Sequence, residues 1–253
     1  MTTLALNPFS AGAVDATTAT TTTVTGPATA TAGHGLKFVA AVSPFKTTTA
    51  PIVKATGTVT FTIVGSDSST VACAGGNSSP ALSRTGTASC KVSPATLSAA
   101  ASPYAVTATY SGDDNFAGSS NEISQTVGLA TTRITLSFAP KVASAAATVV
   151  TATLTGSSGL LPTGKVHFVV LPSLNNPTKA SLDNCSGKAS DDFQVLSSNE
   201  APKPKAVVTC QLSAGWFNAS STAKTSTWAV EASYNGDRNF GQVQVTKTGT
   251  VKG

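Results

Sequence analysis

The chain has 253 residues, a formal net charge of +5 and a charged fraction of 11%, well below the roughly 25% of ordinary soluble domains. Its Lys and Arg residues are scattered and aromatic residues make up only 6%, which argues against a nucleic-acid-binding surface. No apolar run approaches the ~20 residues of a membrane span. The abundance of Thr, Ser, Ala and Gly, with few helix-favouring charged residues, predicts an all-β protein of two domains.

Residues 1–18 form a mildly apolar arm that lies outside the repeat described below. An extended apolar arm can add a strand to the open edge of a neighbouring sheet, whereas the alternative is a disordered tail. The residues expected to contact a partner subunit are Leu4, Leu6, Pro8 and Phe9. The arm also lacks the basic start and apolar run of a signal peptide. We therefore expect either a mature or recombinant piece of a secreted protein or a protein that reaches its destination without the secretory route.

Seven short strands are predicted in residues 19–128. They are expected near 22–25, 36–42, 57–64, 70–73, 87–92, 105–110 and 122–127. In the third of them Val59, Phe61 and Ile63 alternate with Thr, which is the period-2 pattern of a half-buried strand. Seven such strands separated by turn residues predict a β-sandwich. A short crossover turn is expected at 94–99.

The segment at 110–116, Tyr-Ser-Gly-Asp-Asp-Asn-Phe, recurs at 234–240 as Tyr-Asn-Gly-Asp-Arg-Asn-Phe, with five of seven positions identical. The segment at 56–61, Thr-Gly-Thr-Val-Thr-Phe, is likewise matched by Thr-Gly-Lys-Val-His-Phe at 163–168. Because these landmarks recur in the same order, the second part of the chain is predicted to repeat the fold. Its strands are expected near 134–138, 148–154, 165–170, 181–185, 206–212, 228–234 and 243–250.

The predicted boundaries are 1–18 for the arm, 19–128 for the first domain and 129–253 for the second. The linker at 128–131 reaches at most about 14 Å, so the two domains should form an elongated, moderately stiff rod. The second copy is longer, and its extra residues are expected in surface loops at 172–178 and 199–205, which are rich in Pro and polar turn residues.

The repeated Tyr-x-Gly-Asp-x-Asn-Phe motif is predicted to be a structural turn between the last two strands. Its Gly provides backbone freedom, its Asp bonds to its own backbone in an Asx turn, and its Phe folds back into the core. The residues concerned are Tyr110, Gly112, Asp113 and Phe116 in the first copy and Tyr234, Gly236, Asp237 and Phe240 in the second. A calcium site is the alternative, but Arg238 replaces Asp114 in the second copy. We therefore expect no metal and no cofactor.

The segment at 56–61, the Cys73/Cys90 pair and the motif at 110–116 together resemble the bacterial immunoglobulin-like repeat domains of surface and adhesion proteins and of some phage virion proteins. The resemblance covers residues 19–253. It implies two tandem immunoglobulin-like Greek-key sandwiches with an exposed, non-catalytic role. The second copy departs from this pattern in its longer loops.

Four cysteines allow three pairings. Repetition favours pairing within each copy, Cys73 with Cys90 and Cys185 with Cys210. Each bond is expected to tie neighbouring strands rather than the two sheets. Zinc binding is the alternative, but no Cys-x-x-Cys occurs and no His lies close in sequence. Disulfides would imply an oxidising location.

The sequence offers no convergent acid, base and nucleophile, and His34 and His167 are expected to be exposed without a chemical role. We therefore expect a non-enzymatic display protein, an accessory (decoration) subunit on an extracellular assembly such as a phage head or tail, anchored through the arm. The alternative is a spacer or stalk of a secreted bacterial adhesin. Glycan binding through an exposed Trp216 and Tyr104 is a third hypothesis. The expected partners are protein subunits of a larger assembly or a cell-surface protein or glycan, with no nucleic acid and no membrane insertion.

Overall fold

The structure is a computed structural model that describes residues 17–48, 50–139, 148–171, 180–181, 196–198, 205–212 and 225–252. Within these ranges the protein is built of β-strands, and the helical elements are two short 3-10 turns. The prediction of an all-β protein is therefore confirmed. No helix in the described ranges is long and apolar enough to cross a membrane.

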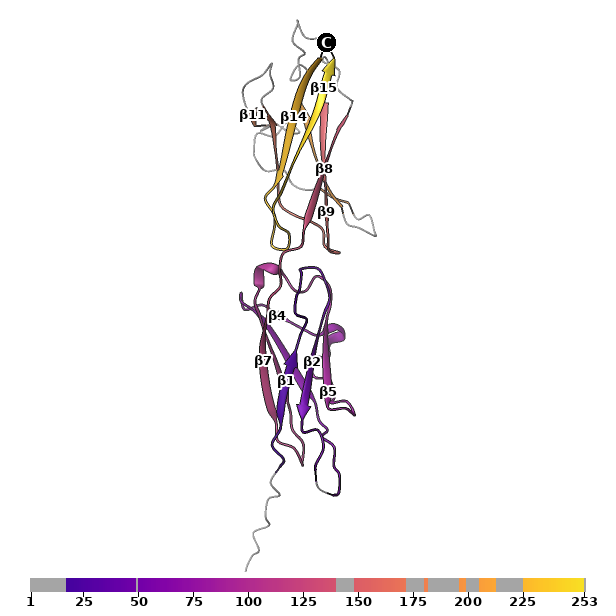
Figure 1. Cartoon of the computed structure of the whole chain (residues 1–253), viewed down its shortest axis with the longest axis vertical. Helices are drawn as coiled ribbons and strands as arrows, with labels where there is room; N and C mark the ends of the chain where they lie inside the picture. The colour runs from indigo at the N-terminus through magenta and orange to yellow at the C-terminus, as the bar shows by residue number, and fades with distance from the viewer. Residues whose placement is uncertain are drawn as a thin grey trace, which may run out of the picture.

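The chain folds into two halves that follow one another along the sequence. The first half contains β1 (Thr21–Thr25), β2 (Leu36–Ser43), β3 (Val59–Gly65), β4 (Thr70–Val71), η1 (Ala74–Gly76), β5 (Thr87–Val92), η2 (Ala99–Ala101), β6 (Tyr104–Tyr110) and β7 (Ser119–Gln125). The second half contains β8 (Thr132–Ala139), β9 (Thr148–Gly156), β10 (Val166–Leu171), β11 (Ala180–Ser181), β12 (Leu196–Ser198), β13 (Lys205–Leu212), β14 (Thr225–Tyr234) and β15 (Val243–Lys252). Figure 1 shows the two halves arranged end to end.

Each half contains two antiparallel sheets. In the first half the strand orders are β1-β2-β5 and β4-β3-β6-β7. In the second half they are β8-β9-β13-β12 and β11-β10-β14-β15. The same order therefore recurs in both halves, and the short β12, which the sequence did not predict, is added at one edge. The loop predicted at 172–178 lies outside the described residues, and so does the loop predicted at 199–205 except Lys205, which begins β13.

Each half has its own hydrophobic core. The first core contains side chains from Val24 to Val127, and the second contains side chains from Ala130 to Phe240. In β3 the inward-facing Val59, Phe61 and Ile63 are buried and the Thr residues between them are exposed, as the alternation predicts. Apolar burial of this kind is the main favourable contribution to folding, so the period-2 pattern orients the strand.

The open edge between the two sheets of the first half is closed by polar contacts. The hydroxyls of Thr22 in β1 and Ser119 in β7 lie 2.7 Å apart. The N–H of Val24 donates to Oδ1 of Asn121 at 3.1 Å. These bonds satisfy backbone and side-chain groups that a sheet edge otherwise leaves unpaired.

The predicted disulfide between Cys73 and Cys90 is confirmed, with a Cα–Cα distance of 5.3 Å. Its predicted placement is wrong. Cys73 follows β4, whereas Cys90 lies in β5 of the other sheet, so the bond connects the two sheets instead of neighbouring strands. Cys210 is also disulfide-bonded, and its expected partner, Cys185, lies outside the described residues.

Candidate functional site: the turn motifs and the joint between the halves

The first-copy motif is organised around the carboxylate of Asp113. Its Oδ2 accepts hydrogen bonds from the N–H and the hydroxyl of Thr56, at 2.6 and 2.8 Å. Its Oδ1 accepts from the N–H groups of Asn115 and Phe116, both at 2.9 Å. The second pair of bonds forms the Asx turn, and the first connects this turn to the start of β3. Hydrogen bonds to a carboxylate are shorter and stronger than those between neutral groups, so Asp113 acts as a clamp between two loops.

The second copy repeats this clamp around Asp237. Its Oδ2 accepts from the N–H and hydroxyl of Thr163 at 2.8 and 2.7 Å. Its Oδ1 accepts from the N–H groups of Asn239 and Phe240 at 2.7 and 2.9 Å. The sequence showed both landmarks in each copy but not that they bind one another. The two landmarks recur together in both copies, and this shared recurrence could have suggested the contact.

These hydrogen bonds keep both carboxylates ionised. Burial acts to raise the pKa of Asp237, but the bonds from Thr163, Asn239 and Phe240 outweigh it and hold the pKa below its usual value. The same balance of burial against hydrogen bonds lowers the pKa of Asp113. The carboxylate oxygens that a calcium ion would use are thus engaged by the protein. No group of three or more His, Cys, Asp or Glu is placed to hold a metal in the part of the chain that the structure describes.

The aromatic residues of the motif are buried. Phe116 and Phe240 lie in the two cores, and so do the rings of Tyr110 and Tyr234. The buried hydroxyls of both tyrosines lack a hydrogen bond of acceptable geometry. Burial, followed by the nearby charge of the motif Asp, raises the pKa of each tyrosine. Both hydroxyls therefore stay protonated beside the carboxylate.

Glycine is required where the motif turns. Gly112 has φ +73, and a Cβ there would lie 2.8 Å from the N atom of Gly118. Gly236 has φ +82, and its Cβ would lie 2.7 Å from the carbonyl oxygen of Phe240. Side chains rarely adopt this backbone region, so both sites accept only glycine without rearrangement.

The remaining predicted site residues are placed differently. Tyr104 is buried, and its hydroxyl donates to the Ser98 carbonyl at 3.0 Å and accepts from the Ser98 N–H at 2.8 Å. The prediction that Tyr104 is exposed for glycan binding is therefore wrong. His34 is exposed, and His167 is half-buried. Outside the described residues lie Trp216 and the arm residues Leu4, Leu6, Pro8 and Phe9. Thr18, which we assigned to the arm, already pairs with Phe116 of the first half.

The linker is hydrogen-bonded to both halves. The N–H and carbonyl of Gly128 bond to loop 30–32 of the first half, at 2.9 Å each. The N–H of Ala130 donates to the Asn239 carbonyl at 2.8 Å, and the Gly241 N–H donates to the Ala130 carbonyl at 3.1 Å. The second-copy motif and the residue that follows it therefore bind the linker through backbone hydrogen bonds. In the first copy Thr18 occupies the equivalent position.

One side of the joint is formed by η2 and the second-copy motif. The Arg238 carbonyl accepts from the Ala100 N–H at 3.0 Å and from the Ser98 hydroxyl at 3.3 Å. The Ala99 N–H donates to Oδ1 of Asn239 at 3.4 Å. The first N–H groups of a helical turn have no partner within the turn. The Ser98 hydroxyl oxygen of the first half accepts from the Ala100 N–H at 3.1 Å, and the motif of the second half supplies further partners to this turn.

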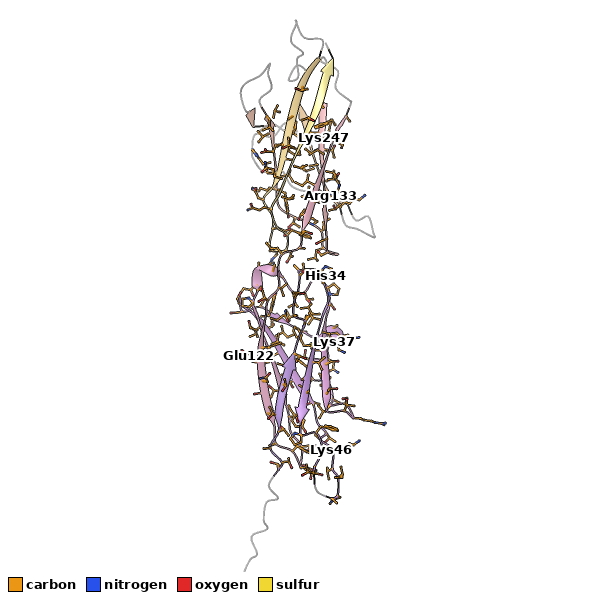
Figure 2. All side chains as sticks on the ribbon, in the orientation of Figure 1. His34, Lys37, Lys46, Glu122, Arg133 and Lys247 are labelled. Atoms are coloured by element: carbon orange, nitrogen blue, oxygen red, sulfur yellow. A yellow bond between two sulfur atoms is a disulfide. The ribbon has the colours of Figure 1, made fainter. Side chains whose placement is uncertain are left out.

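The other side of the joint is formed by close packing. Gly33 has φ +83, and a Cβ at this position would lie 2.5 Å from both Cβ and Oγ of Ser158 and 2.9 Å from Cγ of Leu160. Ala32 and Ser158 are buried. Figure 2 shows the neighbouring His34 at the end of the first half that faces the second half. The linker is thus flanked by contacts on two sides.

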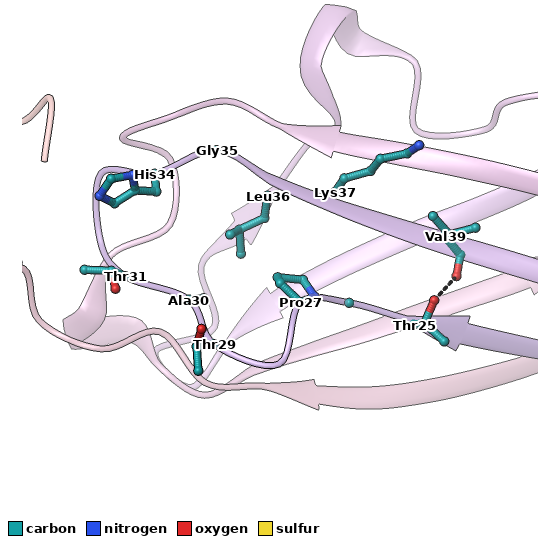
Figure 3. Close-up of a pocket in the computed structure, with 11 residues that line it drawn as sticks. Thr25, Pro27, Thr29, Ala30, Thr31, His34, Gly35, Leu36, Lys37 and Val39 are labelled. Carbon is teal, nitrogen blue, oxygen red and sulfur yellow. Dashed lines mark hydrogen bonds between the residues drawn. The ribbon is translucent and has the colours of Figure 1, made fainter.

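An open depression of about 630 Å³ lies in the first half beside the joint, between loop 25–31 and the start of β2. Figure 3 shows its lining, which includes Pro27 and Leu36 together with the exposed His34 and Lys37. The lining residues that the structure describes include no carboxylate.

No protein-family model and no curated protein sequence matches this chain. Among solved structures, the crystal structure of red sea bream transglutaminase is similar with a TM-score of 0.33 and 11% sequence identity. That match covers 92% of this chain and 31% of the transglutaminase chain, so this chain spans less than a third of that protein. A similarity of this size carries no argument about fold or function.

Proposed function

We propose that this chain is a non-enzymatic structural protein, a stiff spacer of two immunoglobulin-like sandwiches that displays its outer loops on an extracellular assembly. The observation that carries the proposal is the joint. Its linker is hydrogen-bonded to both halves, and the turn at 237–240 rests on η2. Domains joined by a free linker are expected to move relative to each other, whereas a linker paired on both sides restricts that motion.

The strand orders support the immunoglobulin-like part of the proposal. If the strands of the first half are lettered A, B, C, C′, E, F and G in chain order, the sheets are A-B-E and C′-C-F-G. Immunoglobulin-like Greek-key sandwiches divide their strands between two sheets in this way. The second half has the same division, with β12 beside its E strand, β13.

The cysteines support an extracellular location. Cys73 and Cys90 are bonded to each other, and Cys210 is also disulfide-bonded. Structural disulfides persist in oxidising surroundings and are rare in the cytosol. We place the rod on a phage head or tail, anchored through residues 1–16. The stalk of a secreted adhesin would use the same rod without that anchor.

Small-angle X-ray scattering tests the spacer role. The full chain is compared with a variant that carries Gly-Ser-Gly-Ser between Leu129 and Ala130, because such linkers behave as flexible coils. A stiff joint predicts that the scattering of the natural chain fits a single elongated shape and that only the variant requires an ensemble. If both proteins require the same ensemble of shapes, the spacer proposal is wrong.

Deletion of residues 2–16 tests the anchor, with light scattering after size-exclusion chromatography as the measurement. Self-assembly of the full chain that is lost on deletion would support the decoration subunit. If both proteins run as the same elongated monomer, residues 2–16 do not drive self-assembly and the stalk is favoured.

A further inference from the structure

The two copies of the motif differ in charge at one position. Asp114 in the first copy corresponds to Arg238 in the second. Both side chains are exposed. Arg238 lies at the joint, where its carbonyl is bonded to η2. Asp114 lies at the far pole of the first half, because β6 begins beside η2 and ends at Tyr110, next to the motif. The charge therefore differs between the turn that contacts another half and the turn that does not.

An acidic residue of the first half borders the same 3-10 turn. Asp67 lies in the loop between β3 and β4, and the N–H of its neighbour Ser66 donates to the Ala101 carbonyl at 2.9 Å. The Ala100 N–H donates to the Arg238 carbonyl at 3.0 Å. Two consecutive residues of η2 thus connect the backbone beside Asp67 to the backbone of Arg238. The two opposite charges border one short turn from the two halves.

The electrostatic environment of Asp67 agrees with this placement. The hydroxyl and N–H of Ser69 and, more weakly, the charge of Arg238 hold the pKa of Asp67 below its usual value. The Ser69 N–H donates to Oδ1 of Asp67 at 3.0 Å, which orients the carboxylate. The exposed carboxylate is therefore ionised and oriented by Ser69, and the charge of Arg238 from the other half acts on it.

We propose that Arg238 and Asp67 are an orienting pair that sets how the second half docks on the first. The attraction acts between exposed side chains, and such pairs contribute little to stability. Complementary charges across an interface nevertheless favour one register over others and disfavour like-charged partners. A turn with Asp at this position would place two negative charges beside η2. Asp67 of the first half therefore favours a turn that carries Arg238, as in the second copy, over a turn that carries Asp, as at position 114 in the first copy.

Charge reversal in the intact chain tests the pair, with residual dipolar couplings of the 15N-labelled protein as the measurement. The variants are Arg238→Asp, Asp67→Arg and the double reversal. Arg238→Asp is compatible with the turn, because Asp114 already occupies the equivalent position. The hydrogen bonds of the joint at this residue come from its carbonyl and are not removed. We expect each single reversal to weaken the agreement of the two halves with one shared alignment tensor, and the double reversal to restore it.

Two further variants separate charge from shape. Arg238→Lys should keep the shared tensor, whereas Arg238→Gln should lose it in part. Asp114→Arg is the matched control at the far pole and should leave the shared tensor unchanged. Because salt at 1 M shortens the screening length to about 3 Å, high salt should move the natural protein toward the behaviour of Arg238→Gln.

The inference is overturned if Arg238→Asp keeps the natural tensor or if the double reversal fails to restore it. The proposed spacer role is judged separately. It fails if the natural chain itself gives different alignment magnitudes for its halves, whatever the variants do. If the natural joint is stiff and charge reversal does not change the shared alignment tensor, only the proposal of an orienting pair is wrong.

Discussion

Asp237 accepts hydrogen bonds from both the N–H and the hydroxyl of Thr163, which lies 74 positions earlier in the chain. The same carboxylate closes its own turn through Asn239 and Phe240. The two residues that follow Asp237 in this turn form part of the joint, because the Arg238 carbonyl and Asn239 Oδ1 accept hydrogen bonds from the first half. The Asp237 clamp within the second half therefore orders the turn that binds the first half.

Replacement of Asp237 by Ala removes the acceptor of four hydrogen bonds. We expect the second half to lose about 2–3 kcal/mol of unfolding free energy, since bonds to charged groups are the stronger ones and their donors would be left unpaired. Chemical denaturation should show the second half unfolding at lower denaturant. Asp114→Ala, at an exposed position of the first-copy turn, is the control and should have little effect. Equal destabilisation by both variants would argue against the clamp.

Removal of a single hydroxyl from the clamp should have a smaller effect. Thr163→Val keeps the N–H bond to Asp237 and loses the hydroxyl bond of 2.7 Å. We expect a loss of about 1 kcal/mol, and Thr56→Val should do the same in the first half. Thr135→Val is a comparison outside the clamp, because its hydroxyl makes only a long bond of 3.4 Å to a carbonyl. A loss for Thr135→Val as large as the losses for Thr163→Val and Thr56→Val would contradict this ranking.

Stability should fall in acid because of Asp113 and Asp237. Hydrogen bonds hold the folded pKa of both below the ordinary value of 3.8, so the unfolded chain takes up protons at higher pH than the folded chain. The contribution of these carboxylates is complete above that ordinary value and is lost as the pH falls through the folded pKa. Melting temperatures between neutral pH and strong acid should show this decline. It should be shallower in Asp237→Asn, which cannot titrate, and an unchanged slope would refute the assignment.

Gly33 should be needed for the joint and not for either core. Gly33→Ala would place a Cβ 2.5 Å from Ser158 of the other half, in a backbone with φ +83. We expect a bent or loosened rod in small-angle scattering. Gly75→Ala is a matched control, because Gly75 has φ +80 but nothing within 4 Å of the added atom. It carries a similar backbone cost without the clash, so an identical change in shape would refute a role for Gly33 in the joint.

Loss of the Cys73–Cys90 bond should destabilise the first half. The bond closes a loop with a sequence separation of 17, for which chain entropy predicts roughly 3 kcal/mol. A Cys73→Ala/Cys90→Ala double variant leaves no free thiol at the site. Its unfolding free energy should fall by about that amount, with the second half unchanged. An equally stable double variant would show that the bond contributes nothing to folding.

The alternation of Val59, Phe61 and Ile63 predicts β3 and its buried face because side-chain direction in a strand depends only on neighbouring residues. The pairing of Cys73 with Cys90 was predicted from the repeat, because each copy contains one pair of cysteines. The burial of Tyr104 did not, since it depends on the Ser98 backbone that receives its hydroxyl. Local patterns also did not indicate that this disulfide crosses between sheets.

The sequence by itself therefore determined an all-β chain, most of its strands and the first disulfide, since these depend on residue spacing and on repetition. Only the tertiary structure decided that Thr163 binds Asp237 and that the second-copy turn rests on η2. These contacts join residues that are distant in the chain, and hydrogen bonds select partners by distance and angle in space. Sequence distance carries no such information, which is why the joint became visible only in the folded protein.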